Sequence, residues 1–469
     1  MSASTPDNAL GRIRDYIPRF ADAELARRLR ATGAVLVEGP RGCGKTQTAL
    51  RAAKSVVRLD RDPAARAAGA LNPALLLTGE RPRLIDEWQL VEDVWSEVRG
   101  DVDDHPEQTG RYILTGSAVP ADDATRHTGS LRFTRLRMRP MSLAESGYSS
   151  KAVSLAAVFA GGDVGAADPG LDVHEIAERI VIGGWPALLR RDPVDAMTAT
   201  QGYLDETCRV DLGRLDGPRH DPANVARVLR SLARNIATEA SASTIGDDVA
   251  GADGAGTVNY HTVIDYIKAL TRVFVVEDLP AWSPALRSRG VLRSSPTRHF
   301  VDPSLAAAAL GAGPDRLLQD TETLGLLFES LVVRDLRIYG QAIGATVFHY
   351  RENTGAEADA ILQMRDGRWA ALEVNSVSAT STRGPAACFG SPPMSTPTVT
   401  ASPRFWRWSP AGALPTEGPT ASSSSRWGLS RPDQVAGAAG AHPGCQYPPG
   451  VYKPACQVVQ LCTKRPVKS

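Results

Sequence analysis

The stretch VLVEGPRGCGKTQTAL, Val35 to Leu50, decides the fold of the first part of this chain. Its apolar beginning is typical of a buried strand, and its end is typical of a helix. Between them lies GPRGCGKT, which follows the pattern G-x-x-x-x-G-K-[ST]. A glycine-rich loop placed between a strand and a helix predicts a phosphate-binding site.

The residue types of this loop explain the chemistry that we expect of it. Glycines let the backbone curl so that N–H groups point at phosphate oxygens, and the next helix adds its positive N-terminal end. We expect Lys45 to reach the β- and γ-phosphates and Thr46 to ligate Mg²⁺, so the predicted cofactors are ATP and Mg²⁺. The residues predicted to bind the nucleotide are Gly39, Pro40, Arg41, Gly42, Cys43, Gly44, Lys45, Thr46 and Gln47.

Two later apolar segments supply candidate catalytic residues. RLIDEWQ, from Arg83, ends in a carboxylate pair where open parallel sheets bind ligands. We expect Asp86 to hold Mg²⁺ through water and Glu87 to polarise the attacking water. The next segment, YILTGSA from Tyr112, predicts a strand whose end places Ser117 near the γ-phosphate or the water. The alternative for the Asp86–Glu87 pair is a solvated strand end.

Arg132 completes the predicted catalytic set of Lys45, Glu87, Ser117 and Arg132. We predict that it acts as a finger on the phosphate of a neighbouring subunit, which requires a homo-oligomer. A surface arginine on a basic strand is the alternative. The predicted metal ligands are Thr46 and Asp86.

The remaining pattern divides the 469-residue chain into several units. The first is a parallel α/β sheet of the P-loop NTPase class, and RFTRLRMRPMSLAE, from Arg132, predicts its last strand, which Pro140 stops. The predicted segments are an N-terminal helical lead at 1–30, the P-loop core at 31–150, a helical, winged-helix-like domain at 151–300, a small α+β domain at 301–375 and a disordered tail at 376–469.

The two later domains are predicted from their apolar periodicity. YHTVIDYIKAL, from Tyr260, predicts an amphipathic helix, and the strand VFVVEDL that follows favours a winged-helix arrangement. The run from Gly246 to Gly256 is rich in Gly, Asp and Ala and predicts a loop. LGLLFESLVVRDL, from Leu324, predicts a helix before three strands, ATVFHYRE, EADAILQM and RWAALEVN.

After Asn375 the composition changes to Ser, Pro, Gly and Thr, and Glu417 and Asp433 are the remaining acids. Because the change falls inside the third domain, we interpret the tail as the product of a shifted reading frame. An ordinary disordered tail is the alternative.

Bulk properties narrow the function classes. The chain has 53 basic and 52 acidic residues, so the total charge indicates no nucleic-acid or membrane partner. It lacks an apolar run of about 18 residues, which predicts a cytoplasmic protein without a membrane partner. Its six cysteines show no metal-binding spacing.

With those residues placed, the sequence resembles a family of bacterial and archaeal AAA-type ATPases that carry a C-terminal domain of unknown function related to the restriction-endonuclease fold. The resemblance runs from about Gly33 to Asn375. The motifs that carry it are GPRGCGKT, LIDEWQ, YILTGS, LRMRPMSLAE, GGWPALL, HFVDPSLAAAALG, LLFESLV, EADAILQM and WAALEVN.

The resemblance implies an ATPase with a PD-(D/E)xK-like third domain, in which Glu329, Asp359 and Glu373 would bind Mg²⁺. The family-like E-V-K reads Glu373, Val374, Asn375 here, and an amide cannot supply the positive charge of the lysine. We therefore predict ATP binding and hydrolysis that move the C-terminal domains, without nuclease activity.

A nucleic-acid-binding module regulated by nucleotide is the alternative function. DNA or RNA phosphates would then be contacted by a set of basic residues whose affinity falls with salt. The candidates are Arg135, Arg137, Arg139, Arg287 and Arg289.

Overall fold

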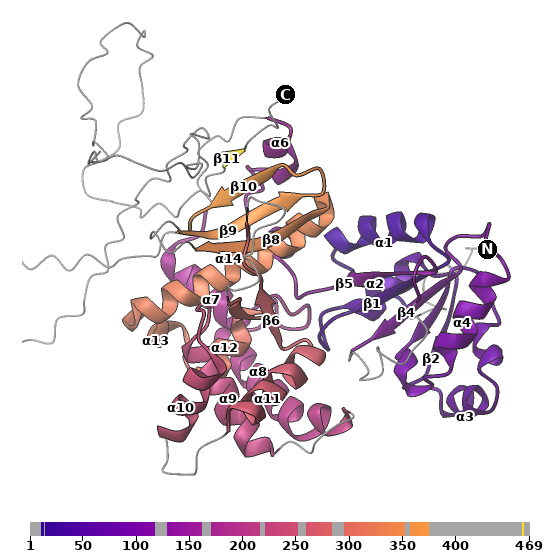
Figure 1. The fold of residues 1–469 in the computed structure, drawn as a ribbon, viewed down its shortest axis with the longest axis horizontal. Helices are drawn as coiled ribbons and strands as arrows, with labels where there is room; N and C mark the ends of the chain where they lie inside the picture. The colour runs from indigo at the N-terminus through magenta and orange to yellow at the C-terminus, as the bar shows by residue number, and fades with distance from the viewer. Residues whose placement is uncertain are drawn as a thin grey trace, which may run out of the picture.

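The computed structural model describes residues 11–13, 15–117, 129–161, 170–215, 221–251, 259–283, 295–351, 357–374 and 462–463. Three units follow one another: an α/β unit (20–137), a helical unit (173–319) and a C-terminal unit (321–374). In Figure 1 the α/β unit lies at the right, the helical unit below, and the C-terminal unit at the upper left in orange. Helix α1 packs against α14 of the C-terminal unit.

The α/β unit contains a parallel sheet in the order β2-β3-β4-β1-β5. Its strands are β1 (Ala34–Glu38), β2 (Ser55–Arg58), β3 (Arg83–Asp86), β4 (Tyr112–Gly116) and β5 (Phe133–Arg137). Its helices are α1 (Phe20–Ala31), α2 (Lys45–Ala52), α3 (Pro63–Leu71), η2 (Pro73–Leu77), η3 (Trp88–Leu90) and α4 (Val94–Asp103). The predicted P-loop NTPase class is therefore confirmed, including the basic last strand.

Both faces of the central strands β3, β4 and β1 are buried, which explains why these strands are nearly continuous apolar runs. On β1, Val35 and Val37 face one hydrophobic cluster, whereas Ala34 and Leu36 face a second. The first cluster includes residues of α1 and α2, and the second includes residues of α4. This two-residue alternation fixes the register, so every carboxyl end lies at one edge of the sheet.

The helical unit follows two short helices, α5 (Leu143–Ser146) and α6 (Leu155–Phe159). Its elements are α7 (Val173–Ile182), α8 (Pro193–Glu206), η5 (Thr207–Asp211), η6 (Leu212–Arg214), α9 (Pro222–Arg234), α10 (Ala242–Gly251), α11 (Tyr260–Arg272), β6 (Val276–Leu279), β7 (Thr297–Phe300), α12 (Pro303–Leu310) and α13 (Pro314–Gln319). Strands β6 and β7 pair antiparallel after α11, as a winged helix requires, but that identity stays a prediction.

One loop prediction in this unit is wrong. Helix α10 extends to Gly251, so it includes the first half of the glycine-rich run that we expected to be a loop. Ile245 and Val249 are buried in the core that contains α9 and α11, and this burial outweighs the low helix propensity of glycine. Residues 252–258 lie outside the described part of the chain.

The C-terminal unit consists of one long helix and an antiparallel sheet. The elements are α14 (Thr321–Ile343), β8 (Ala345–Arg351), β9 (Glu357–Met364), β10 (Trp369–Leu372) and β11 (Cys462–Thr463). The predicted helix and three strands are present. Of the region that we predicted as a disordered, frameshifted tail, the structure describes only the two residues of β11, which pair with β10; the rest lies outside the described residues.

Packing bears on the predicted domain boundaries. Helix α12 packs against α7, α8 and α9, and α13 packs against α7. Val158 and Phe159 of α6 belong instead to the cluster that contains Leu336 of α14. The boundary at residue 300 stays a proposal, and this packing favours one near residue 320. No helix among the described residues is long and apolar enough to cross a membrane.

Candidate nucleotide site

The predicted phosphate-binding loop connects β1 to α2 and is tightly curled. Gly39 has φ +151°, and a Cβ there would lie 2.2 Å from the carbonyl oxygen of Met138. Gly44, with φ +104°, caps the N-terminus of α2 in the left-handed region. Both positions therefore require glycine, and the loop directs the N-terminal end of α2 at the carboxyl edge of the sheet.

Lys45 lies within the curve of the loop. Its side chain is buried, and Nζ donates hydrogen bonds of 2.8 Å to the carbonyl oxygens of Gly39 and Pro40. These contacts position an ammonium next to the backbone that would surround phosphate groups. The loop alone thus concentrates positive charge at this point.

The two predicted metal ligands are in direct contact. Thr46 Oγ1 donates to Asp86 Oδ1 at 2.9 Å, and Thr115 Oγ1 donates to the same oxygen. Asp86 ends β3 and Thr115 lies in the neighbouring β4, so the parallel register brings both to the start of α2. A hydroxyl and a carboxylate, completed by phosphate oxygens and water, suit the coordination of Mg²⁺.

Glu87 and Ser117, two of the predicted catalytic residues, are in contact with each other. Ser117 Oγ donates to Glu87 Oε2 at 3.2 Å, and Gln89 Nε2 donates to the same oxygen. Glu87 has φ 55° and ψ 48°, a left-handed conformation that is uncommon outside glycine. Backbone strain of this kind is often found where a side chain must be aimed at a site.

These residues border one cavity of about 770 Å³, which lies in the size range of small-molecule sites. From the α/β unit its lining includes Arg41, Gly42, Gly44, Lys45, Thr46 and Gln47, together with Glu87, Gln89 and Ser117. From the helical unit and the segments beside it come Pro186, Ala187, Asp211, Leu215, Arg272 and Val273. Gly39, Pro40 and Cys43, predicted with this set, form the buried back of the loop.

Sequence reasoning missed the residue that supports the loop from behind. Arg19, just before α1, donates from Nη1 to the carbonyl oxygen of Cys43 and from Nη2 to that of Arg139, both at 2.8 Å. Its Nε lies 3.1 Å from Glu145 Oε1. One buried guanidinium therefore ties the loop to the end of β5. Its partners are too far away in the sequence for any local pattern to have indicated it.

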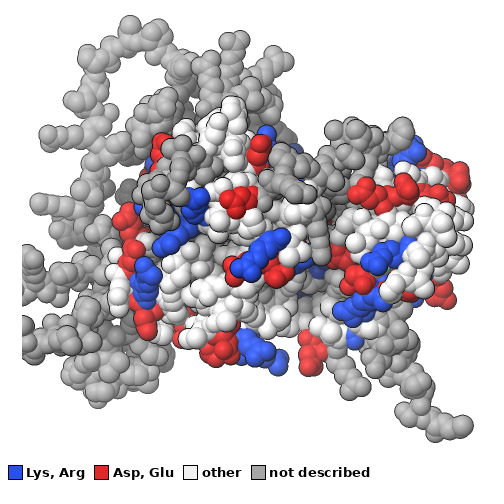
Figure 2. Space-filling model, turned by 90° about the horizontal axis from the view of Figure 1, so that it is seen from below, with Lys and Arg blue, Asp and Glu red and all other residues white. Residues whose placement is uncertain are grey.

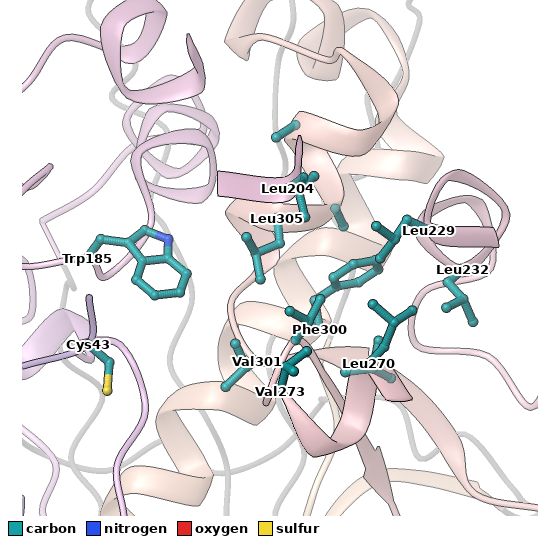
Figure 3. Close-up of a cluster of buried hydrophobic side chains, with 14 of the residues drawn as sticks. Cys43, Trp185, Leu204, Leu229, Leu232, Leu270, Val273, Phe300, Val301 and Leu305 are labelled. Carbon is teal, nitrogen blue, oxygen red and sulfur yellow. The ribbon is translucent and has the colours of Figure 1, made fainter. Parts of the chain in front are cut away.

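The GGWPALL motif contacts the other side of the loop. A Cβ on Gly42 would lie 3.8 Å from the Trp185 ring, and one on Gly44 would lie 3.7 Å from Pro186. Figure 3 shows Trp185 between Cys43 and Leu305. The indole Nε1 of Trp185 donates to Ser304 Oγ at 2.9 Å. The motif was part of the family resemblance, but its spacing gave no indication of this position.

A buried ion network continues from this motif into the C-terminal unit. Asp302 Oδ2 accepts from the backbone N–H of Gly184 at 3.0 Å and from Arg334 Nη1 at 2.7 Å. Arg334 Nη2 also donates to Asp335 Oδ1 at 2.7 Å, and Asp335 Oδ2 accepts from the N–H of Leu143 at 2.9 Å. The GGWPALL motif beside the loop, α12 and α14 are thus connected by hydrogen bonds.

Arg132 is not brought to this site within one chain. It precedes β5, which runs parallel to β1, so it lies at the amino edge of the sheet, opposite the loop. Its Nε donates to Asp103 Oδ1 at 2.5 Å. A role on a neighbouring subunit stays a proposal.

The arginines proposed as nucleic-acid contacts on β5 are engaged in ion pairs. Arg135 and Arg137 lie 3.3 and 3.6 Å from Glu38 carboxylate oxygens. Arg139 donates to both oxygens of Glu277. Burial raises the pKa of Glu277, but three surrounding guanidiniums outweigh it and hold that pKa far below its usual range. Arg287 and Arg289, the other candidates, lie outside the described residues.

The C-terminal carboxylates are close in space without forming a metal site. Burial, with the charges of Asp359 and Glu357, raises the pKa of Glu329 to about 8. Burial also raises the pKa of Asp359, and Glu373 follows β10 directly. In the ranges that the structure describes, no three or more His, Cys, Asp or Glu side chains are grouped to hold a metal ion. The PD-(D/E)xK-like character of this unit stays a prediction.

The segments that match known families correspond to the three units of the fold. Residues 31–147 match the family described as AAA domain. Residues 173–316 and 324–388 match two domains of unknown function, DUF8612 and DUF4143. Uncharacterized proteins of Mycobacterium tuberculosis and Mycobacterium bovis are each 26% identical over 368 residues, which is 77% of this chain and 75% of theirs.

Two solved structures can be aligned with part of this chain at low similarity. The Walker-type ATPase of Pyrococcus abyssi has a TM-score of 0.41 at 14% identity, over 64% of this chain and 97% of that one. The Aeropyrum pernix ORC2 protein has a TM-score of 0.31 at 15% identity, over 66% and 97%. From the family match, the glycine loop and the parallel sheet together, we conclude that residues 31–147 are a P-loop domain of the AAA type, in a chain that continues into DUF8612 and DUF4143 regions.

Proposed function

We propose that this chain is a Mg²⁺-dependent ATPase whose nucleotide state moves the helical and C-terminal units. The observation that supports it best is the convergence of two pairs, Thr46 with Asp86 and Ser117 with Glu87, of which Thr46, Glu87 and Ser117 line the cavity that the loop borders. Binding alone would need the loop, whereas hydrolysis needs these oxygens as well.

Each side chain has a role that follows from its position. Lys45 would exchange its two carbonyl partners for β- and γ-phosphate oxygens. Thr46 and Asp86 would hold Mg²⁺, which when bound neutralises charge that develops on the phosphates. Glu87 would orient the attacking water, and Ser117 and Gln89 fix the carboxylate by donating to it.

The proposed movement rests on the walls of the cavity. Arg272 and Val273, at the end of α11, line it opposite the loop. A bound triphosphate would attract the guanidinium of Arg272, and its loss on hydrolysis would release that attraction. The contacts from Gly184 through Asp302 to Arg334 would transmit the change to α14.

The site is tested by measuring nucleotide binding and phosphate release separately. Lys45→Ala should abolish saturable binding of a fluorescent ATP analogue, because it removes the ammonium inside the loop. Glu87→Gln should keep binding but lower kcat by about 10²- to 10⁴-fold, the usual contribution of a general base. Glu97→Gln, an exposed change on α4, is the matched control. Equal turnover of Glu87→Gln and Glu97→Gln would refute the assignment.

A further inference from the structure

A second cavity, of about 530 Å³, lies in the helical unit and is separate from the nucleotide site. It is bordered by α9, by the end of α10, and by the segment from α12 to the start of α14. Its charged and polar lining includes Arg227, Arg230, Ser231, Arg234, Asp248 and Arg316. None of these residues contributes to the proposed ATPase chemistry.

Three of the arginines form a row on one face of α9. Arg227, Arg230 and Arg234 are spaced three and four residues apart, which places them on the same side of a helix. Seven residues of helix correspond to about 10 Å, so the row spans that length. Arg316 of α13 adds a fourth guanidinium to the lining.

The acidic residues of the lining are already engaged. Asp248 accepts from Arg234 at 2.6 Å. Asp320 caps α14 by accepting from the N–H and the hydroxyl of Thr323, and these hydrogen bonds lower its pKa. Positive charge is therefore left over on the row.

The positive charge that no acidic residue of the lining neutralises lies on Arg227 and Arg230. Among the described residues Arg230 has no hydrogen-bond or ion-pair partner, and its side chain is exposed. Arg227 donates from Nη2 to Asn224, but its buried Nη1 has no partner there. Arg230 is thus accessible to an oxyanion, and Arg227 beside it carries a buried donor that a small shift of its side chain would turn toward the same ligand.

Ser231 gives an independent indication of a ligand. The residue is 3% exposed, lines the cavity, and its Oγ has no hydrogen-bond partner among the described residues. Buried hydroxyls are normally hydrogen-bonded, and an unsatisfied one costs about 1 to 3 kcal/mol. A bound oxygen beside Arg227 and Arg230 would satisfy it.

We propose that this cleft binds the phosphodiester backbone of a nucleic acid. One strand carries a charge about every 3.4 Å along a duplex, and Arg227 and Arg230 are about 4.5 Å apart along α9, so the pair can meet two neighbouring phosphates of one strand. Figure 2 shows basic and acidic side chains interspersed on one face, without a broad basic surface among the described residues visible there.

The test uses the full chain and a fluorescein-labelled DNA duplex in fluorescence anisotropy. Arg227→Ala with Arg230→Ala should weaken binding about tenfold or more for each charged hydrogen bond lost, and lower the slope of log affinity against log salt by about 2. Lys54→Ala with Arg66→Ala removes two exposed charges from the α/β unit and is the matched control. ATP hydrolysis should be unchanged in both, so the proposal is separable from the ATPase.

Arg230→Glu alone separates lost binding from misfolding. It changes an exposed side chain, so the protein should stay folded, and it should also weaken DNA binding. Circular dichroism melting would verify that each variant is folded. Equal affinity and equal salt slope in the cleft and control variants would overturn the proposal. So would competition by inorganic phosphate as strong as by DNA, or binding of anionic phosphatidylserine vesicles without binding of DNA.

Discussion

Replacing Arg334 by Met tests the buried ion network that runs from Gly184, beside the loop, through Asp302 to α14. The Arg334 side chain is 2% exposed and that of Asp302 is 0% exposed. Arg334 Nη1 lies 2.7 Å from Asp302 Oδ2, and Arg334 Nη2 lies 2.7 Å from Asp335 Oδ1. The substitution keeps most of the volume but leaves two carboxylates in a dry environment with no cation between them.

The expected loss can be estimated from this geometry. Removing one partner of a buried ion pair destabilises a protein by about 3 to 5 kcal/mol, because the remaining charge is not solvated. In a unit of this size that corresponds to a fall in Tm on the order of 10 °C. Since Asp302 also holds the N–H of Gly184 beside the loop, affinity for ATP should decrease as well.

Differential scanning calorimetry without nucleotide measures the first effect, and ATP-analogue titration measures the second. Arg191→Met is the control, because Arg191 is exposed and surface changes of this kind usually stay within about 0.5 kcal/mol. Adding Asp302→Asn to Arg334→Met should recover part of the loss by removing one buried charge. The reasoning is refuted if Arg334→Met melts with the control and the added Asp302→Asn brings no recovery.

Two further predictions compare a residue in a tight or buried position with a less constrained residue of the same type. Gly39→Ala should abolish ATP-analogue binding, because its Cβ would collide with the Met138 carbonyl. Gly100→Ala in α4 is the control: its Cβ meets nothing within 4 Å, so it should bind the analogue normally and stabilise the fold by up to about 1 kcal/mol. Similar binding by the two variants would contradict this prediction. Glu329 binds its proton more tightly when folded, with a pKa of about 8 against 4.5, so the folded state loses stability as pH rises between these values. The Tm of Glu329→Gln should therefore rise relative to that of wild type from pH 5 to 8, which corresponds to a gain of a few kcal/mol at most in the free energy of unfolding. Glu322→Gln on the same helix should show no such rise, and parallel curves of Tm against pH for the two variants would exclude this origin.

The sequence predicted the loop and its carboxylates well because their order along the chain determines their chemistry. Lys45 and Thr46 are adjacent to the glycines that curl the backbone. Asp86 and Ser117 each follow an apolar strand, and parallel strands bring such ends to one edge. Local pattern and topology were enough for this part of the site. The same rule places Arg132, which comes just before its strand, at the opposite edge, so the topology argued against a role for it in the same subunit's site.

The rest depended on contacts between distant residues. Arg19 and Cys43, Trp185 and Ser304, and Arg139 and Glu277 are separated by 24, 119 and 138 residues. Each partner taken alone resembles a surface charge or an ordinary core residue. The glycine-rich end of α10 illustrates the same limit, because its helix is stabilised by burial that composition does not reveal.

The ion pairs between Glu277 and the arginines around it affect how this protein can be divided into recombinant fragments. Glu277 belongs to β6, but it neutralises Arg139, which follows the last strand of the α/β unit, and it also lies within 3.7 Å of Arg137. A recombinant fragment that stopped near residue 150 would lose this carboxylate and bring both cations into water with their shared counter-charge missing. The stability of the first domain expressed by itself should therefore depend more strongly on salt, because added ions screen the repulsion between the two arginines, whereas a fragment that continues through β7 keeps the neutralising residue.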